Sequence, residues 1–392
     1  MKRKPEVKTK DSSKAWLAAI IIINALWALL AVLARRIPDF APFYSNTVYQ
    51  LLQGILSRFS NLFPFSLSEA LLYALPVAFV IALVVKIAKK KSPAGLFKTA
   101  AIVISSLLLI YQLNCGINYY NISFAEKEGF SQVTNDKELL LEFCEFTAAK
   151  LHESSAAAKN IGNGAASGAE NVSAAASGTE NASGVASDSG NANSTIKYPD
   201  GAELATEAIK AMEKLGTIYP SLDGYYPRPK GLINSRPFSN MGVTGIYSPF
   251  TIEANYNSEM TAYNLPFTAC HELSHLRGFM NESEANFIAF LACINSDNQA
   301  FQRSGYLLAW TYAGNQLYKV DREAFNRLRT SLPDDVKKEL DENNQFWDTY
   351  ETKASEVQDS VNDAYLKQHG IAEGIQSYGR VVGLMLAWFA AS

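Results

Sequence analysis

The sequence predicts a mainly α-helical chain in which three transmembrane helices precede an α+β domain with a small β-sheet. Three observations lead to this fold class. All long apolar runs lie before residue 116, apolar residues recur at helical spacing through much of the remainder, and a short stretch near residue 245 is rich in β-forming residues. The 48% hydrophobic content of the 392 residues is therefore shared between two unlike halves.

Residues 1–115 form the predicted membrane region. Three apolar segments, at about 15–34, 67–85 and 96–113, are long enough to cross a hydrocarbon core of about 30 Å. Each must be helical, because lipid offers the backbone no hydrogen-bond partner. The first segment follows basic residues as a signal peptide does. Its apolar run is longer, however, and ends at Arg35-Arg36 instead of at small residues, so we expect a retained anchor.

Basic residues predict the orientation of these spans. Cytoplasmic loops carry an excess of Lys and Arg, and two basic groups flank the spans on one side of the membrane. We therefore expect a multi-pass cell-membrane protein with a cytoplasmic N-terminus and with the chain outside the cytoplasm from about residue 116. Arg35, Arg36 and Arg58 lie in the opposite loop but are fewer. The two groups are Lys2, Arg3, Lys4, Lys8, Lys10 and Lys14, and Lys86, Lys89, Lys90, Lys91 and Lys98.

The rest of the chain divides by composition. Apolar residues at helical spacing from 136 to 152 predict a helix within residues 116–152, the start of the extracytoplasmic domain. Residues 153–195 are almost wholly Ala, Ser, Gly, Asn, Glu and Thr. Such a segment cannot bury enough apolar area to offset its ordering entropy, so we expect a disordered low-complexity insertion. Residues 196–392 complete the domain.

Periodicity and turn signals predict the elements of this last part. A helix at about 200–215 precedes a Pro/Gly/Tyr-rich loop that ends near Asn240. Residues 242–252 predict a strand, and Pro249 places it at a sheet edge because proline cannot donate to a ladder. The final apolar run is too short to span and predicts a packed terminal helix. Helices are expected at about 282–294, 299–320, 322–332, 334–364 and 375–391.

The charge balance excludes one class of partner. With 35 Lys and Arg against 38 Asp and Glu, the formal net charge of -3 offers no basic field for a polyanion. We therefore expect no nucleic-acid partner, whereas the spans imply the lipid bilayer as one. The four cysteines are too sparse for a disulfide framework in a chain of this size.

One short motif, His271-Glu272-Leu273-Ser274-His275, carries the chemistry. Histidines four residues apart share one face of a helix, so both His271 and His275 can present a nitrogen to a zinc ion. Glu272 beside them can take a proton from a water that the metal holds, which is the general-base step of metallopeptidases. The chain has only four histidines, and a chance match has odds on the order of one in a few hundred.

The third ligand is expected from the next helix. A catalytic zinc site usually takes three protein ligands and leaves a fourth position for water. Gly278 can end the first helix and turn the chain back, and Glu282 and Glu284 open the second. Asn281 can cap that helix with Glu284 in a capping box, which occupies Glu284 and leaves Glu282 free. We therefore expect one Zn²⁺ ion held by the two histidines and Glu282, with Glu284 as the alternative.

These residues resemble known families. The motif followed by Glu282-x-x-Ala285-Asn286 resembles gluzincin metallopeptidases, in which that glutamate is the third zinc ligand. A wider set of segments resembles the bacterial membrane family labelled domain of unknown function 3810. The resemblance implies a zincin-like domain after N-terminal spans, with Glu282 as third ligand and Asn286 orienting a histidine. The segments that carry it are 247–255, 266–268, 271–279, 282–287 and 376–382.

Peptidases of this type often bind substrate as an added strand. Residues 245–255 are the candidate sheet edge that binds a peptide or protein substrate. The sequence fits equally well a structural strand that binds no substrate. A donor for the oxyanion is also needed. The candidates are Tyr256, His369, Tyr378 and Arg380, and the resemblance favours the last two.

The function expected is a membrane-anchored zinc-dependent metallopeptidase with Glu272 as general base. The alternative is a non-catalytic zinc-binding extracytoplasmic domain with a structural or sensing role. Glu272 argues against this alternative, because a structural zinc site has no use for a carboxylate beside its ligands.

Overall fold

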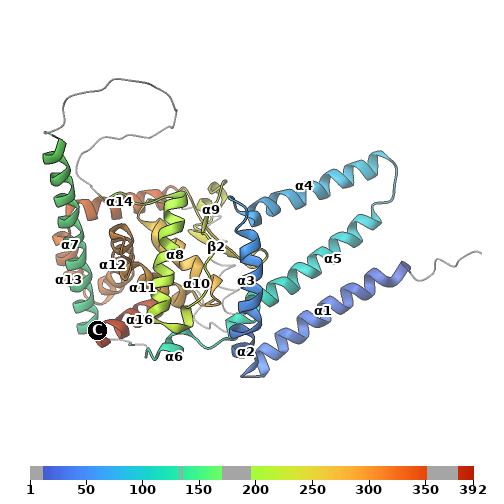
Figure 1. Cartoon of the computed structure of the whole chain (residues 1–392), viewed down its shortest axis with the longest axis horizontal. Coiled ribbons are helices and arrows are strands. Elements are labelled where there is room, and N and C mark those ends of the chain that lie inside the picture. Colours follow the sequence, from blue (N-terminus) through green and yellow to red (C-terminus); the bar gives the residue numbers. More distant parts are fainter. Residues whose placement is uncertain (1–11, 132, 134–135, 170–195, 351–377) are drawn as a thin grey trace, which may run out of the picture.

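The structure is a computed structural model that describes residues 12–131, 133, 136–169, 196–350 and 378–392 (Figure 1). Three long helices project from one side of a globular part that contains the other elements. The described chain is mainly helical and has one small three-stranded sheet, so the predicted fold class is confirmed at this level.

The projecting helices are α1 (Ser12–Arg36), α4 (Leu67–Ala88) and α5 (Ala94–Tyr111), and each is long and apolar enough to cross a membrane. Few of their side chains are buried by protein, as lipid-facing residues require. α1 packs along α5, and Asn24 donates a hydrogen bond of 2.9 Å to Ser105 between them. The prediction of three apolar spans is confirmed, with ends that differ by a few residues.

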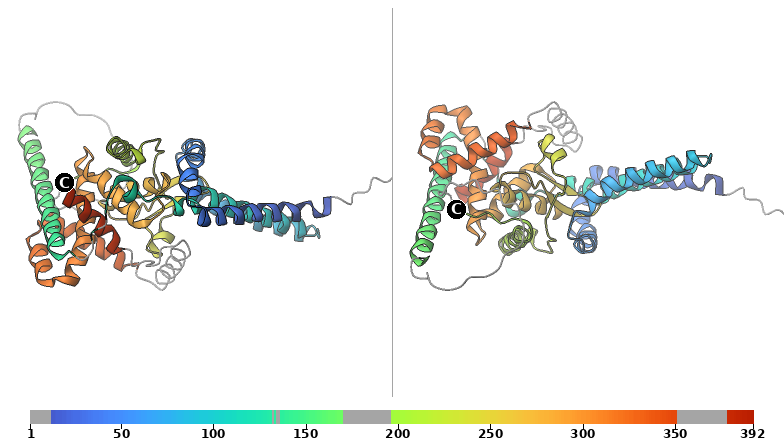
Figure 2. Two further views of the ribbon diagram at one scale, coloured as in Figure 1. Left: turned by 90° about the horizontal axis from the view of Figure 1, so that it is seen from below. Right: turned by 90° about the horizontal axis from the view of Figure 1, so that it is seen from above.

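Two helices that the sequence did not predict lie between the first two spans. α2 (Phe40–Asn46) and α3 (Val48–Ser60) are found at the boundary between the spans and the globular part, and α3 runs across the direction of the spans (Figures 1 and 2). The membrane region expected for residues 1–115 is therefore interrupted by a segment that packs on the domain. After α5 the chain continues as a short π-helix, η1 (Gln112–Gly116), and a single 3-10 turn, η2 (Asn118–Tyr120).

Helices α10 (Asn264–Leu276) and α11 (Glu282–Ile294) occupy the centre of the globular part. Nearly all residues of both helices are buried, as expected for helices surrounded by protein. α8 (Gly201–Ile218) and α12 (Gln299–Val320) pack against both of them. The bounds of α11 and α12 are those predicted from the sequence.

The outer helices are α7 (Lys137–Ala169), α13 (Arg322–Ser331), α14 (Asp334–Asp348) and α16 (Tyr378–Ala391). α16 packs on α11, as predicted for a terminal helix too short to span a membrane. The part of the predicted 334–364 helix that follows Tyr350 lies outside the described residues.

Helix α7 differs from the prediction. It does not end near residue 152 but continues to Ala169. Alanine is the strongest helix former, so an Ala-rich segment can extend a helix that has already been nucleated without a buried face of its own. The expected disordered insertion is shortened accordingly, and residues 170–195 lie outside the described part of the chain.

The sheet has the strand order β1–β3–β2. β1 (Lys230–Gly231) pairs in parallel with β3 (Glu253–Tyr256), and β2 (Gly245–Ser248) pairs with β3 in antiparallel. The prediction of one strand over 242–252 is wrong, because the chain turns after Ser248, with Ile252 at a φ of 49°, and returns as β3. β3 is therefore the central strand and β2 is an edge.

The segment expected to be a loop up to Asn240 also contains short elements. They are η3 (Pro220–Leu222), β1 and α9 (Arg236–Asn240). Two residues of pairing and single helical turns are too short to give a periodic apolar pattern, so the sequence alone could not show them.

Arg303 on α12 is fully buried and connects this helix to α14. Its guanidinium lies 2.7 Å from Asp335 Oδ2 and 2.8 Å from Glu339 Oε2. Arg303→Met leaves both carboxylates largely buried and without a cation, although each keeps one hydroxyl donor, and loss of one partner of a buried ion pair costs about 3–5 kcal/mol. We expect the variant to lower the free energy of unfolding of the full chain by that amount, measured by chemical denaturation in detergent micelles.

Lys338→Met is the matched control for this prediction. Lys338 pairs with Glu342 on the exposed face of the same region, at 3.6 Å. Exposed pairs contribute at most about 1 kcal/mol, so the control should unfold close to wild type. An Arg303→Met variant as stable as this control would contradict the structural role of the buried pair.

Candidate metal centre

Helix α10 presents His271 and His275 one turn apart on the same face. The helix ends at Leu276, and Gly278 has a φ of 100°, a left-handed conformation that lets the chain reverse direction. A Cβ at this glycine would lie 3.3 Å from the ring of Tyr49 on α3. Both the conformation and the close packing therefore require glycine here.

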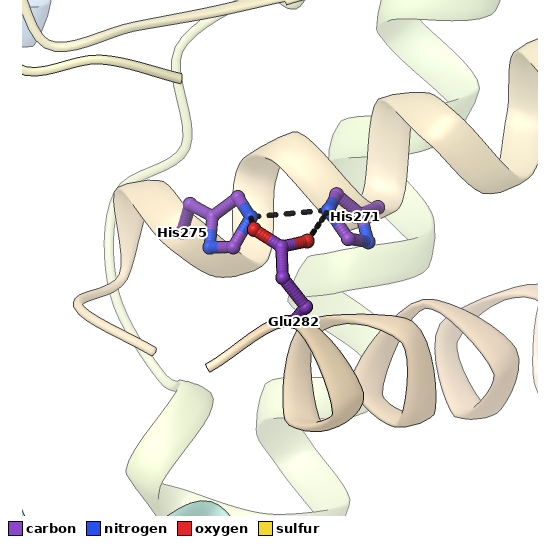
Figure 3. A group of neighbouring side chains, drawn as sticks. All are labelled: His271, His275 and Glu282. Carbon is purple, nitrogen blue, oxygen red and sulfur yellow. Dashed lines mark hydrogen bonds and ion pairs between the residues drawn. The ribbon is translucent and has the colours of Figure 1, made fainter. Parts of the chain in front are cut away.

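The reversed chain enters α11 with Glu282 as its first residue. Asn281 caps the helix, because its side-chain oxygen accepts hydrogen bonds from the N–H groups of Ser283 and Glu284. The carboxylate of Glu282 then extends toward the two imidazoles of α10 (Figure 3). The structure brings together the two histidines and Glu282, with all three ligand atoms within 4.8 Å of one another.

The distances fit a tetrahedral metal site. The Nε2 atoms of His271 and His275 are 3.0 Å apart, and they lie 3.2 Å and 3.6 Å from the two carboxylate oxygens of Glu282. A zinc ion with bonds of about 2.0–2.1 Å at tetrahedral angles separates its ligand atoms by about 3.3 Å. Two imidazoles and one carboxylate are also a ligand set that catalytic zinc takes in proteins.

Hydrogen bonds orient both imidazoles for a metal. His275 Nδ1 lies 2.8 Å from the carbonyl oxygen of Phe279, and this nitrogen must donate because a carbonyl can only accept. His271 Nδ1 lies 2.8 Å from Oδ1 of Asn286, one turn beyond Glu282 on α11. Both Nε2 lone pairs therefore face the shared space. Asn286 has the position that the family resemblance implied.

Two lone pairs and a carboxylate at these distances repel one another unless a cation lies between them. Burial lowers the pKa of His275, but the Glu282 carboxylate outweighs burial and raises that pKa to about 9. Burial raises the pKa of Glu282, yet the two imidazoles hold it well below its usual range. A proton on one histidine reduces this repulsion in part, whereas a zinc ion can bind all three ligand atoms at once. The residues present therefore fit zinc.

Glu272 lies beside the histidines with one oxygen unpaired. The residue is 3% exposed, and one of its oxygens accepts the backbone N–H of Tyr247 on β2. Its Oε2 has no hydrogen-bond partner among the described residues, although buried polar atoms nearly always have one. Burial raises the pKa of Glu272 to about 7, while the charges of His271 and His275 act in the opposite direction.

The contact between Glu272 and strand β2 was not predicted. A Cβ at Gly245 would collide with Oε1 of Glu272 and with Thr268 on the same helix, so only glycine allows this approach. The sequence did contain a signal, because glycine inside a strand often marks a place where another group comes close. Its partner could not be named from the sequence.

Glu284, the alternative ligand, is not brought to the histidines. Its carboxylate accepts hydrogen bonds from the backbone N–H groups of Phe124 and Ala125 at the start of α6 (Phe124–Glu128), the second at 3.4 Å. Glu284 is buried and lines a cavity of about 360 Å³ together with Asn281 and Arg380. It therefore holds α6 against the start of α11.

The candidate oxyanion donors lie in separate places. The hydroxyl of Tyr256, on β3, meets the backbone N–H of Gly201 at the start of α8. Arg380 lines the cavity beside the turn between α10 and α11. The side chain of Tyr378 and the whole of His369 lie outside the described residues. The donor remains a prediction.

The chain matches the family described as Protein of unknown function (DUF3810) over residues 44–386. It belongs to this family. It has no match among curated proteins or among solved structures. The DUF3810 region begins after α1 and includes α3, the second and third spans, α10 and α11. The family unit is therefore larger than the globular part alone.

Zinc content tests which glutamate is the ligand. The full chain purified in detergent should hold one equivalent of zinc, and Glu282→Gln should lose most of it because one of three protein ligands is gone. Glu284→Gln is the matched control and should keep its zinc, since its carboxylate faces α6. Metal loss only in Glu284→Gln would reverse the assignment.

Asn286→Ala tests the orienting hydrogen bond. Loss of a group that holds a metal-binding histidine typically weakens metal affinity by about 10–100-fold, and we expect this for the variant in chelator competition. Asn295→Ala just beyond the other end of α11 is the control, because among the described residues its side chain bonds only the carbonyl of Leu291. Equal zinc affinity in the two variants would show that Asn286 has no such role.

Proposed function

We propose that this chain is a membrane-anchored zinc metallopeptidase that hydrolyses peptide bonds, with a zincin-like domain and Glu272 as general base. One observation carries the proposal. Three ligand atoms, from His271, His275 and Glu282, converge at the spacing of a zinc site, and a buried glutamate with an unpaired oxygen adjoins them. A purely structural site has no use for that glutamate.

Each residue has a defined part in the proposed reaction. Zinc, when held by His271, His275 and Glu282, polarises the scissile carbonyl and makes a coordinated water acidic. Oε2 of Glu272 takes the proton of the attacking water and returns a proton to the leaving amine. The N–H of Tyr247 holds the other oxygen of Glu272, which limits rotation of the carboxylate. Burial of Glu272 keeps bulk water from competing for it.

An extended peptide or protein segment is the proposed substrate. β2 is an edge strand, and its Tyr247 contacts Glu272, so an extended chain paired with the rest of β2 would pass the site, while the N–H of Tyr247 itself is taken by Glu272. β3, the second half of the expected 245–255 edge, is paired on both sides and is not available. The proposed edge is therefore β2 alone.

The distribution of basic residues supports an extracytoplasmic domain. The turn between α4 and α5 contains Lys89, Lys90 and Lys91, and it lies with the start of α1 at the ends of the spans farthest from the globular part (Figure 1). Basic residues favour the cytoplasmic side. We therefore place the N-terminus in the cytoplasm and the globular part outside as part of the same proposal.

Glu272→Gln separates catalysis from metal binding. The variant should keep its zinc but hydrolyse peptides at least about 10²-fold more slowly, because Gln cannot accept the proton. The measurement uses full chain in detergent and a quenched fluorescent peptide library, with zinc content determined on the same samples. His271→Ala is the control that should lose both zinc and activity.

Two results would contradict the proposal. A Glu272→Gln variant as active as wild type would exclude Glu272 as the base. A wild-type chain that holds one zinc ion, folds, and cleaves no member of the library would favour the non-catalytic zinc-binding domain.

A further inference from the structure

We propose that α3 is an in-plane membrane helix, whose apolar face lies in the interfacial layer of the same bilayer that α1, α4 and α5 cross. The proposal concerns the segment between the first two spans, for which the sequence predicted no element. It rests on the two faces of α3, on where α3 sits, and on how the chain fixes it there.

One face of α3 is apolar and unprotected. Large apolar side chains recur every three or four residues along the helix and just beyond it, which puts them on one side. They are between 39% and 75% exposed, a state unusual for a contiguous apolar stripe in water. The stripe consists of Val48, Leu51, Ile55, Phe59 and Leu62.

The opposite face of α3 is polar and fully engaged with the domain. The Tyr49 hydroxyl donates to the carbonyl of Leu276 at 2.9 Å and lies 3.0 Å from the hydroxyl of Tyr247. Gln53 donates to the carbonyl of Tyr225 at 3.0 Å. A rotation of α3 that buried its apolar stripe would break these buried hydrogen bonds, so the stripe must face away from the domain.

Continuity with the spans identifies the bilayer as the partner. α1 ends at Arg36 and α4 begins at Leu67, and no span lies between them, so this segment stays at one membrane surface. α3 lies across the ends of the spans, between them and the globular part (Figures 1 and 2). The face turned away from the domain is therefore turned toward the side from which the spans emerge. Amphipathic helices in this setting embed about 5–10 Å deep.

Two buried glutamates fix the domain, to which α3 is bonded, to the start of the second span. The carboxylate of Glu253, at the start of β3, accepts the N–H groups of Leu67 and Ser68 at the start of α4. The carboxylate of Glu69 on α4 in turn accepts the N–H groups of Ile233 and Asn234, both at 2.8 Å. These four hydrogen bonds are among those that join the domain to the second span, and α3 is itself bonded to the domain, so α3 cannot lift away from the bilayer independently of the span.

This position brings the metal centre close to lipid. Tyr49 contacts both the last residue of α10 and Tyr247, whose N–H is bonded to Glu272. The site is thus separated from the bilayer surface by little more than one helix, about 10 Å across. If the chain is a peptidase as proposed above, on which this step rests, its substrate class is a peptide segment held near the membrane surface, such as the stalk of an anchored protein.

Spin labels on α3 test the proposal without any need for catalysis. Leu51→Cys, Ile55→Cys and Phe59→Cys are made one at a time in the full chain, labelled with a nitroxide and reconstituted in phosphatidylcholine–phosphatidylglycerol vesicles. The chain contains four cysteines, all of them buried, so labelling is directed to the new site. The accessibility of each label to oxygen, which concentrates in lipid, is compared with its accessibility to a water-soluble nickel complex.

Two exposed valines provide the references. Val80→Cys in the middle of α4 reports lipid, and Val320→Cys at the end of α12 reports water. We expect the three α3 labels to show an oxygen-to-nickel ratio several-fold above that of residue 320 and approaching that of residue 80. A ratio equal to that at residue 320 overturns the proposal. Labels shielded from both reagents also overturn it, because they would show that a second protein surface covers the stripe.

Discussion

The candidate site depends on how the chain reverses between Leu276 and Glu282. Gly278 makes the turn possible, the carbonyl of Phe279 receives the proton on His275 Nδ1, and Asn281 begins the helix that carries Glu282. A turn of a different length would displace the carboxylate by several ångströms and separate it from the imidazoles. Chain reversal, imidazole orientation and ligand placement are thus achieved by the same few residues, and the rest of the globular part packs around them.

Local signals allowed the centre of the molecule to be predicted from the sequence. Histidine spacing, the glycine after the helix and the capping residue before the next one are all short-range features, and they placed Glu282 rather than Glu284 with the histidines. The capping box expected to occupy Glu284 does not form, however, because its carboxylate accepts the N–H groups of Phe124 and Ala125 instead. The bounds of α11 and α12 could also be predicted, because apolar periodicity is likewise a short-range feature. Zinc binding and catalysis are inferences from this geometry and remain predictions.

Features set by distant contacts escaped prediction. The position of Gly245 against Glu272 and of Tyr49 against Leu276 depends on segments that meet only in the folded chain. The turn at Ile252 uses a left-handed conformation that isoleucine rarely adopts. The residue type therefore did not indicate a turn, and the segment was predicted as one strand instead of β2 followed by a turn into β3. In α7 the helix propensity of alanine outweighed the low apolar content from which disorder was expected.

The contact between Tyr49 and Leu276 has a consequence for biosynthesis. The two residues are 227 positions apart, and the ribosome adds about 5–20 residues per second. Tyr49 is therefore synthesised about 10–45 s before Leu276, whose carbonyl accepts its hydrogen bond. Two further spans are translated within that interval. The domain therefore cannot fold first and be inserted afterwards. Helix α3, which α10 contacts through Tyr49, is already part of the inserted chain when α10 is made, so α10 and α11 must fold against a helix that is already in place.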